Sequence, residues 1–263
     1  MSSKSPNLFA SISLKDRILA AGLHLIGSLA IAGVVALLVF SVWYPGEFRY
    51  LAGGTELLLL VMAVDVVMGP VLTFAVFNKA KGIQHLRRDI FIIAVLQMLA
   101  LAYGLNTVRE ARPVALVFEF DRFRVISQSE VVSEELKEAL PEFQALPLFG
   151  PATVALRRSE SGAERSNALA TAIFDGIDTS QRPKFWIPYG PHERTQAVTA
   201  GRPIEELGRQ YPSASIEIKQ LFDRLNIENK SAKFLPVNAR KDAVAVLNVK
   251  GEILGFLPYD GFF

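Results

Sequence analysis

The stretch LLLLVMAVDVVMGPVLTFAVF, residues 57–77, decides the fold of this chain. A helix of that length, at about 1.5 Å per residue, spans the roughly 30 Å hydrocarbon core of a bilayer. A single acid, Asp65, interrupts the apolar run. An ionised carboxylate in hydrocarbon costs at least about 2.5 kcal/mol, so it normally faces protein, water or a partner. We therefore predict a membrane-spanning helix with a polar group facing inward.

Two further apolar runs accompany it, at residues 18–42 and 90–108. Both are long enough to cross a bilayer, and together the runs predict an N-terminal bundle of three transmembrane helices. The first alternative, buried helices of a soluble protein, needs a large polar shell that the short connecting loops cannot provide. The second, a cleaved signal peptide, is disfavoured because the first run is too long and no small-residue cleavage site follows it.

Basic residues near the ends of the spans predict the orientation. They precede the first span and fill the loop between the second and third, whereas the loop between the first and second has only Arg49 and begins with Trp43 and Tyr44, which suit a membrane interface. The basic residues concerned are Lys4, Lys15, Arg17, Lys79, Lys81, Arg87 and Arg88. By the positive-inside rule we expect a cytoplasmic N-terminus, with everything after Val108 on the opposite side of the membrane.

Charge and cysteine content narrow the possible functions. Residues 1–109 carry nine Lys and Arg against five Asp and Glu, and residues 110–263 carry 19 against 21. The C-terminal half therefore has no positive excess with which to hold a phosphate backbone, and nucleic acid is not an expected partner. The chain has no Cys, which removes thiol catalysis, Cys-based metal sites and disulfides.

We expect two domains, a three-span transmembrane domain over residues 1–109 and an extracytoplasmic α+β domain over residues 110–263, with a mixed or antiparallel sheet. The pattern predicts strands at 114–120, 123–127 and 153–159, and a terminal hairpin turning at Lys250-Gly251-Glu252. It predicts helices at 130–140, 162–174 (with Ser161 as N-cap and Glu164 completing a capping box), 203–209 and 213–225. The Pro-rich stretch 182–203 is predicted to be an ordered loop.

The sequence gives no positive case for an enzyme. The topology separates His24, His85 and His192, and no HExxH, GxSxG or GxxxxGK[ST] motif is present. His192 alone is a weak candidate for a general base, and Asp121-Arg122 reads as a turn with a surface ion pair. We therefore expect no catalytic residue, no cofactor and no metal ligand.

Asp65 has two interpretations. Counted at about 1.5 Å per residue from the cytoplasmic ends, its depth is close to that of Tyr103, and Gln97 comes within reach if the helices tilt, whereas His24 is a poorer candidate. The first interpretation is a hydrogen bond inside the bundle. The second is that Asp65 meets a polar group on another membrane segment.

Gly69 and Pro70 add a second irregularity to the same helix. Pro70 has no N–H for the carbonyl of Val66 and predicts a kink, and Gly69 would let a neighbouring helix approach closely. Kinked helices with an acid also occur in transporters, but three spans would then require an oligomer. A helix kinked merely to pack within its own bundle is the simplest explanation.

Several short motifs resemble those of the type IV pilin accessory proteins of the TfpX/TfpZ type. They cover the membrane half and the first external strands, and they comprise Trp43-Tyr44-Pro45, DVVMGP at 65–70, Tyr103-Gly104, Arg112-Pro113-Val114 with VFEFDRFRV, and FGPATVAL at 149–156. The resemblance implies a bacterial inner-membrane protein, with its C-terminal domain in the periplasm, that helps a particular major type IV pilin assemble into pili in a chaperone-like role without known catalysis.

This implied role generates a hypothesis about partners. The three spans would hold the transmembrane helix of the pilin laterally, and the external domain would meet the pilin head. The residues that we expect at the contact are Asp65, Gly69, Pro70, Gln97 and Tyr103. Membrane lipid and a second copy of the chain are further possible partners. The alternative is a membrane-anchored enzyme or ligand-binding sensor with its site between Phe185 and His192.

Overall fold

The computed structural model describes residues 14–79, 82–226 and 231–263, so Lys4 and Lys81, which contributed to the expected orientation, lie outside it. The chain forms two compact units. The first, here called the span unit, comprises Met1–Val39 and Thr55–Val108, and the second, the sheet unit, comprises Phe40–Gly54 and Arg109–Phe263. We describe each unit by itself.

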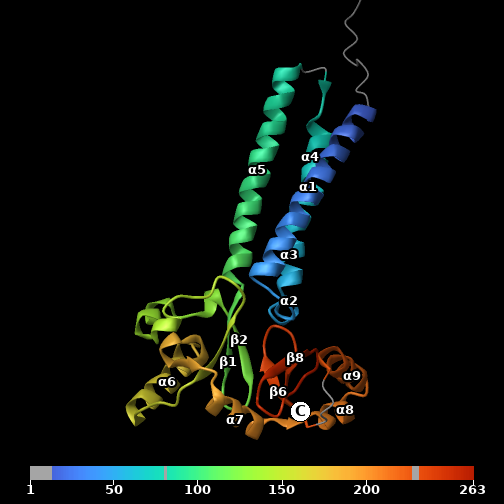
Figure 1. The fold of residues 1–263 in the computed structure, drawn as a ribbon. Coiled ribbons are helices and arrows are strands. Elements are labelled where there is room, and N and C mark those ends of the chain that lie inside the picture. Colours follow the sequence, from blue (N-terminus) through green and yellow to red (C-terminus); the bar gives the residue numbers. More distant parts are fainter. Residues whose placement is uncertain (1–13, 80–81, 227–230) are drawn as a thin grey trace, which may run out of the picture. The chain divides into compact units, whose positions relative to one another are not determined.

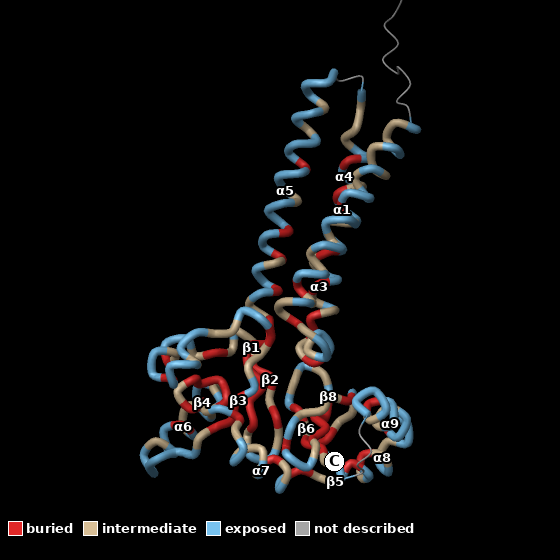
Figure 2. Tube along the Cα trace, in the orientation of Figure 1, coloured by how far each residue is buried: buried red, intermediate tan, exposed pale blue. Residues whose placement is uncertain are grey.

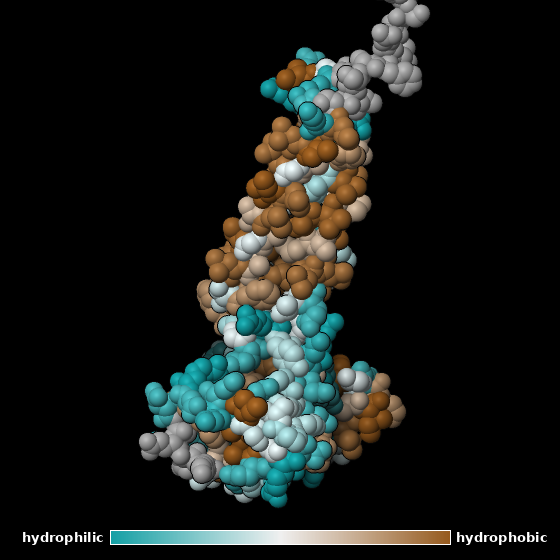
Figure 3. Space-filling view, turned by 90° about the vertical axis from the view of Figure 1, so that its right-hand side faces the viewer, coloured by the Kyte–Doolittle hydropathy of each residue, from teal (hydrophilic) through white to brown (hydrophobic). Residues whose placement is uncertain are grey.

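Within the described residues, the span unit supplies three helices long and apolar enough to cross a membrane. They are α1 (Leu14–Val42), the combined helix formed by α3 (Gly54–Ala63), a π-helical turn (Val64–Met68) and α4 (Gly69–Val76), and α5 (Ile83–Glu110) (Figure 1). Large apolar side chains such as Leu23, Leu60 and Phe91 are more than 60% exposed. Figure 3 shows a continuous hydrophobic surface along this unit. Such a surface is unsuited to water and fits lipid, which confirms the predicted transmembrane class.

The sheet unit is built on a mixed sheet, which decides between the two sheet types left open by the sequence. The described residues form eight strands, of which seven follow the order β4-β3-β1-β2-β6-β7-β8, while β5 pairs with β6. The pairs β1/β3 and β2/β6 are parallel, and the others are antiparallel. The strands are β1 (Pro113–Phe118), β2 (Phe123–Ser127), β3 (Ala152–Leu156), β4 (Trp186–Pro188), β5 (Arg202–Pro203), β6 (Lys233–Asn238), β7 (Ala243–Leu247) and β8 (Ile253–Leu257).

Hydrophobic clusters cover the sheet, and Figure 2 shows the buried positions along its strands. All six residues of β1 are buried, because Leu116 and Phe118 contribute to one cluster while Val114 and Val117 contribute to another. A third cluster lies beneath α8 (Ile204–Gln210) and α9 (Ala214–Leu225). The remaining helices are α2 (Phe48–Leu51), α6 (Gly162–Phe174) and α7 (Pro191–Ala200).

The connection between the first two spans is part of the core of the sheet unit. Leu51 is 1% exposed and belongs to the same cluster as Leu116 and Phe118. The N–H of Lys241 donates to the carbonyl of Leu51 at 3.3 Å, and the rings of Phe48 and Phe256 lie 5.5 Å apart. Residues 40–54 therefore act as a structural segment of the domain that follows the third span.

Tyr44 shows the same packing. The sequence suited it to the membrane interface, but its side chain is fully buried in protein, with its ring against Gly54. A Cβ at position 54 would lie 2.4 Å from that ring, so only glycine fits there. Burial raises the pKa of the Tyr44 hydroxyl, against the opposing charges of Arg240 and Arg112.

Two predicted elements of the sheet unit are wrong. In place of a helix at 130–140, the chain forms short 3-10 turns, including Ser133–Glu138, which bury the carboxylate of Glu135 against Arg182 and Lys184. The stretch 182–203 is not simply a loop, since it contains β4 and α7. Proline is tolerated there because Pro191 occupies the first turn of α7, where its missing N–H removes no helical bond.

Other details refine the sequence analysis. Ser161 caps α6 as expected by accepting from the N–H of Glu164 at 3.1 Å, but the Glu164 carboxylate accepts from the N–H of Glu160 instead of closing a capping box on Ser161. The Asp121-Arg122 turn with its exposed ion pair and the terminal hairpin are confirmed. No sequence pattern predicted β6, which carries Pro236 in its interior.

Candidate functional site

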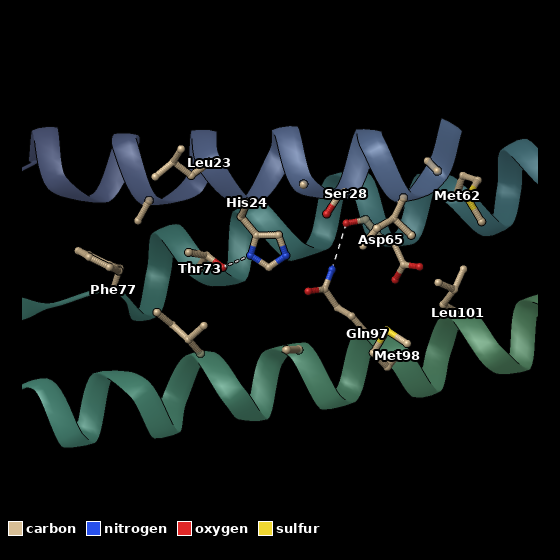
Figure 4. A pocket seen from close by; sticks show the side chains of 16 residues that line it. Leu23, His24, Ser28, Met62, Asp65, Thr73, Phe77, Gln97, Met98 and Leu101 are labelled. Carbon is tan, nitrogen blue, oxygen red and sulfur yellow. Dashed lines mark hydrogen bonds between the residues drawn. The ribbon is translucent and has the colours of Figure 1, made fainter. Parts of the chain in front are cut away.

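The span unit contains a cavity of about 530 Å³ between its helices. Most of the lining is apolar, and five side chains that can form hydrogen bonds project from different helices into this space (Figure 4). These five are His24 and Ser28 on α1, Asp65 in the π-helical turn, Thr73 on α4 and Gln97 on α5. The cavity is therefore a hydrophobic space with a polar wall, inside the part of the chain that lies in the membrane.

His24 and Thr73 form the first polar pair of that wall. The Nδ1 atom of His24 lies 2.6 Å from the Oγ1 atom of Thr73, and Thr73 is 3% exposed. This hydrogen bond links α1 to α4 in a region where lipid could not satisfy either group. The pair belongs to the cavity wall, although His24 was ranked low by its depth in the membrane.

The π-helical turn explains the position of Gln97. In a π turn the carbonyl of residue i faces the N–H of residue i+5, and for Asp65 that residue is Pro70, which has no N–H. The Nε2 atom of Gln97 donates to the main-chain oxygen of Asp65 at 3.2 Å, so a side chain of α5 supplies the missing donor. The expected irregularity at Pro70 is thus accommodated by the π-helical turn at Val64–Met68, which directly precedes Gly69 and Pro70.

One carboxylate oxygen of Asp65 is left without a hydrogen bond. This Oδ1 atom is buried, and no donor reaches it from residues 14–79, 82–226 or 231–263. The expected bond from Tyr103 is not formed, because the Tyr103 side chain is 78% exposed and does not line the cavity. Gln97 contacts the main chain of Asp65 rather than its carboxylate. The polar wall therefore contains a buried carboxylate oxygen that accepts no hydrogen bond from the described residues.

Glycines allow the helices of the span unit to pack closely. A Cβ added to Gly69 would lie 2.1 Å from Nε2 of Gln97 and 2.9 Å from Nε2 of His24, so the close approach expected at Gly69 is present and is made by side chains. A Cβ at Gly104 would lie 2.3 Å from Cγ1 of Val61. Small residues at these positions shape the cavity and keep α3, α4 and α5 in contact.

The sequence of α1 itself indicates which face of this helix lines the cavity. Ala20, His24, Gly27, Ser28 and Ile31 all line the cavity, and their spacing of three and four places them on one face of a helix. A histidine and a serine on the same face as small residues distinguish that face from the leucine-rich remainder of α1.

The Phe185 to His192 segment, considered as an alternative site, serves the core of the sheet unit. Phe185 and Trp186 are at most 2% exposed, and the hydroxyl of Tyr189 donates to the carbonyl of Gly251 at 2.9 Å. His192 is exposed and contacts only Gln196 among the described hydrogen-bond partners. The described residues contain no group of three or more His, Cys, Asp or Glu side chains that could hold a metal ion.

Three apolar spans around a polar-walled cavity, joined to an α+β domain, define a multi-span membrane protein with an attached domain. The chain belongs to the fimbrial assembly protein family, because it is 32% identical over 244 residues to the fimbrial assembly protein of serogroup I from Dichelobacter nodosus. That alignment covers 92% of this chain and 94% of the relative.

Other comparisons agree. The serogroup E1 protein of the same organism is 31% identical over 244 residues, again covering 92% of this chain and 94% of the relative. The protein of serogroups C1 and C2 is 37% identical over 118 residues, which cover 45% of this chain and 90% of that relative. The family model for fimbrial assembly protein FimB matches residues 12–53, which include the first span and the buried connection after it. No solved structure matches the chain.

Proposed function

We propose that this protein is an inner-membrane accessory protein that assists the assembly of a cognate type IV major pilin, holding the pilin transmembrane helix and head before polymerisation. The names of its relatives support a role in pilus assembly. A pilin awaiting assembly has one hydrophobic helix in the bilayer and a globular head outside it. The division of this chain into spans and a sheet unit offers one surface for each part.

The observation that carries the proposal is the cavity of the span unit with its unsatisfied carboxylate. Inside a membrane a polar group without a partner is costly, and it is retained where it serves a contact. The cavity accommodates side chains rather than a whole helix, so the pilin helix lies against the opening and inserts side chains into it. Helix association in lipid depends on such close packing and on interhelical hydrogen bonds.

Asp65 gives the contact its chemistry. A pilin helix that carries its own acidic residue would be repelled by a second carboxylate, so the partner of Asp65 is a donor, either a hydroxyl or a main-chain N–H. Gln97 and Pro70 hold the π-helical turn that presents Asp65, and Gly69 provides the space. Tyr103, exposed on α5, contacts the pilin helix from outside the cavity.

The test is pilin co-purification with Asp65→Asn and Asp65→Leu, each in the full-length protein. Both variants should accumulate normally and keep their thermal stability in detergent, while they capture several-fold less pilin and support fewer surface pili. Leu60→Ala is the matched control, because Leu60 lies on the same span and is 68% exposed. Unchanged capture and piliation with both Asp65 variants would eliminate the contact. A periplasmic reporter fused after Phe263 tests the proposed orientation independently.

A further inference from the structure

An uncharged segment precedes β3 and exposes two large apolar side chains. Residues 143–156 contain no charged residue. Leu148 is 66% exposed and Phe149 is 77% exposed, although their neighbours on both sides are fixed. Phe143 packs its ring 6.3 Å from that of Trp186, and Leu146 packs against the same hydrophobic cluster. The exposed pair is therefore held on a structured loop.

Two independent observations place this loop where the chain leaves the membrane. The N–H of Gly150 donates to the carbonyl of Val42 at 2.8 Å, and Val42 is the last residue of α1. Gly150, at φ +61°, also packs so closely on Pro45 that a Cβ would lie 2.8 Å from the proline ring. Phe149 is thus one residue from a direct hydrogen bond to the end of a membrane span.

The second observation comes from strand register. β3 runs parallel to β1, and Ala152 pairs with Ala115, close to the beginning of β1 at Pro113. β1 follows directly after α5, which ends at Glu110. The beginning of β3 therefore lies at the edge of the sheet that adjoins the end of the third span, as well as the end of the first.

We propose that Leu148 and Phe149 insert into the membrane interface around the end of α1, so that the loop at 143–151 is a lipid-binding surface of the sheet unit. The occupant is lipid because the loop is bonded to the residue at which a lipid-embedded helix ends. Apolar side chains at that level move from water into the boundary between headgroups and acyl chains. Trp43, which directly follows Val42 and is only half-buried, adds an aromatic ring of the type favoured at such interfaces.

The absence of Cys makes the test clean, since a single introduced Cys is the only labelling position. Phe149→Cys in the full-length protein is labelled with an environment-sensitive fluorophore and reconstituted, one copy per lipid nanodisc and without pilin, in phosphatidylcholine that contains a spin-labelled lipid. Val249→Cys is the matched control: Val249 is 55% exposed in the turn after β7. Because β6 runs parallel to β2 and β7 runs antiparallel to β6, that turn lies at the opposite edge of the sheet from Pro113. An unchanged urea midpoint, followed by the combined emission of Trp43 and Trp186, verifies the fold of each labelled protein.

The label at 149 should emit at shorter wavelength in nanodiscs and be quenched by the spin-labelled lipid, whereas the label at 249 should show neither effect. A label at Leu148→Cys should repeat the result for 149. Equal, weak quenching at 149 and 249 overturns the proposal. A shift at 149 that requires added pilin or a second copy of the chain, without lipid quenching, assigns the surface to protein and also overturns it.

Discussion

Replacing Leu51 by Ala tests whether the connection between the first two spans is truly part of the core of the sheet unit. Leu51 is 1% exposed within a hydrophobic cluster formed mainly by residues beyond the third span. Truncation of a buried Leu typically costs about 2–5 kcal/mol, the sum of the lost transfer free energy and the residual cavity. For a domain whose slope in urea is about 2 kcal/mol per M, this corresponds to a midpoint lower by roughly 1–2.5 M.

The assay uses the two tryptophans of the chain. In a Trp43→Phe background the remaining indole is that of Trp186, which is 2% exposed and donates to the carbonyl of Ser180 at 2.8 Å. Its fluorescence in urea therefore reports on unfolding of the sheet unit in the full-length, detergent-solubilised protein. Leu60→Ala, at a lipid-facing position, is the control and should leave the midpoint unchanged. If Leu51→Ala behaves like this control, the connection does not contribute to the core and our reasoning is refuted.

Two further predictions concern buried contacts of the two units. Glu135→Gln should reduce the free energy of unfolding of the sheet unit by about 3–5 kcal/mol at pH 7, because it leaves a buried guanidinium without its charged partner. Burial opposes ionisation of Glu135, but bonds from Arg182 and Lys184 outweigh it and hold its pKa below the usual range. This contribution is therefore complete above about pH 4.5 and is lost as the pH falls through the lower pKa of the folded state, so the difference in urea midpoint between the two proteins should stay constant down to about pH 4.5 and shrink below it. Gly104→Ala should lower the thermal stability of the span unit in detergent, since its Cβ would meet Val61, and Val61→Ala in the same chain should restore it; a double variant no more stable than Gly104→Ala alone would contradict the packing.

Hydropathy was sufficient to identify the spans because an apolar run near 20 residues has few alternatives, and β1, β2 and the terminal hairpin could be read from local alternation and turn residues. Local patterns also named Asp65 and Pro70 as special. Local patterns predicted the wrong element where a residue far away in the sequence determines the structure. Glu135 illustrates this, since its buried pairing with Arg182 accompanies tight turns where the spacing predicted an α-helix.

The error over Tyr103 has a simple geometric origin. Asp65 and Tyr103 lie at similar depths along their helices, but equal depth brings two side chains together only if both also point toward the same space. Six residues separate Gln97 from Tyr103, which rotates one side chain by about 240° from the other in a helix of 3.6 residues per turn. Because Gln97 faces the cavity, Tyr103 must face away from it. Angular position alone would have selected His24 and Ser28, because they share one face of α1 with Ala20, Gly27 and Ile31.

The participation of residues 40–54 in the sheet unit has a consequence for biosynthesis. The ribosome makes this segment first, and the remainder of its domain is complete only after two more spans and about 150 further residues have been synthesised. At typical elongation rates of 5–20 residues per second, Phe48 and Leu51 wait roughly ten seconds or more for the surfaces that cover them. Since two helices separate the segments, both must reach the same side of the bilayer before the nascent chain can close its fold. Correct insertion of the second and third spans is thus a precondition for folding of the sheet unit.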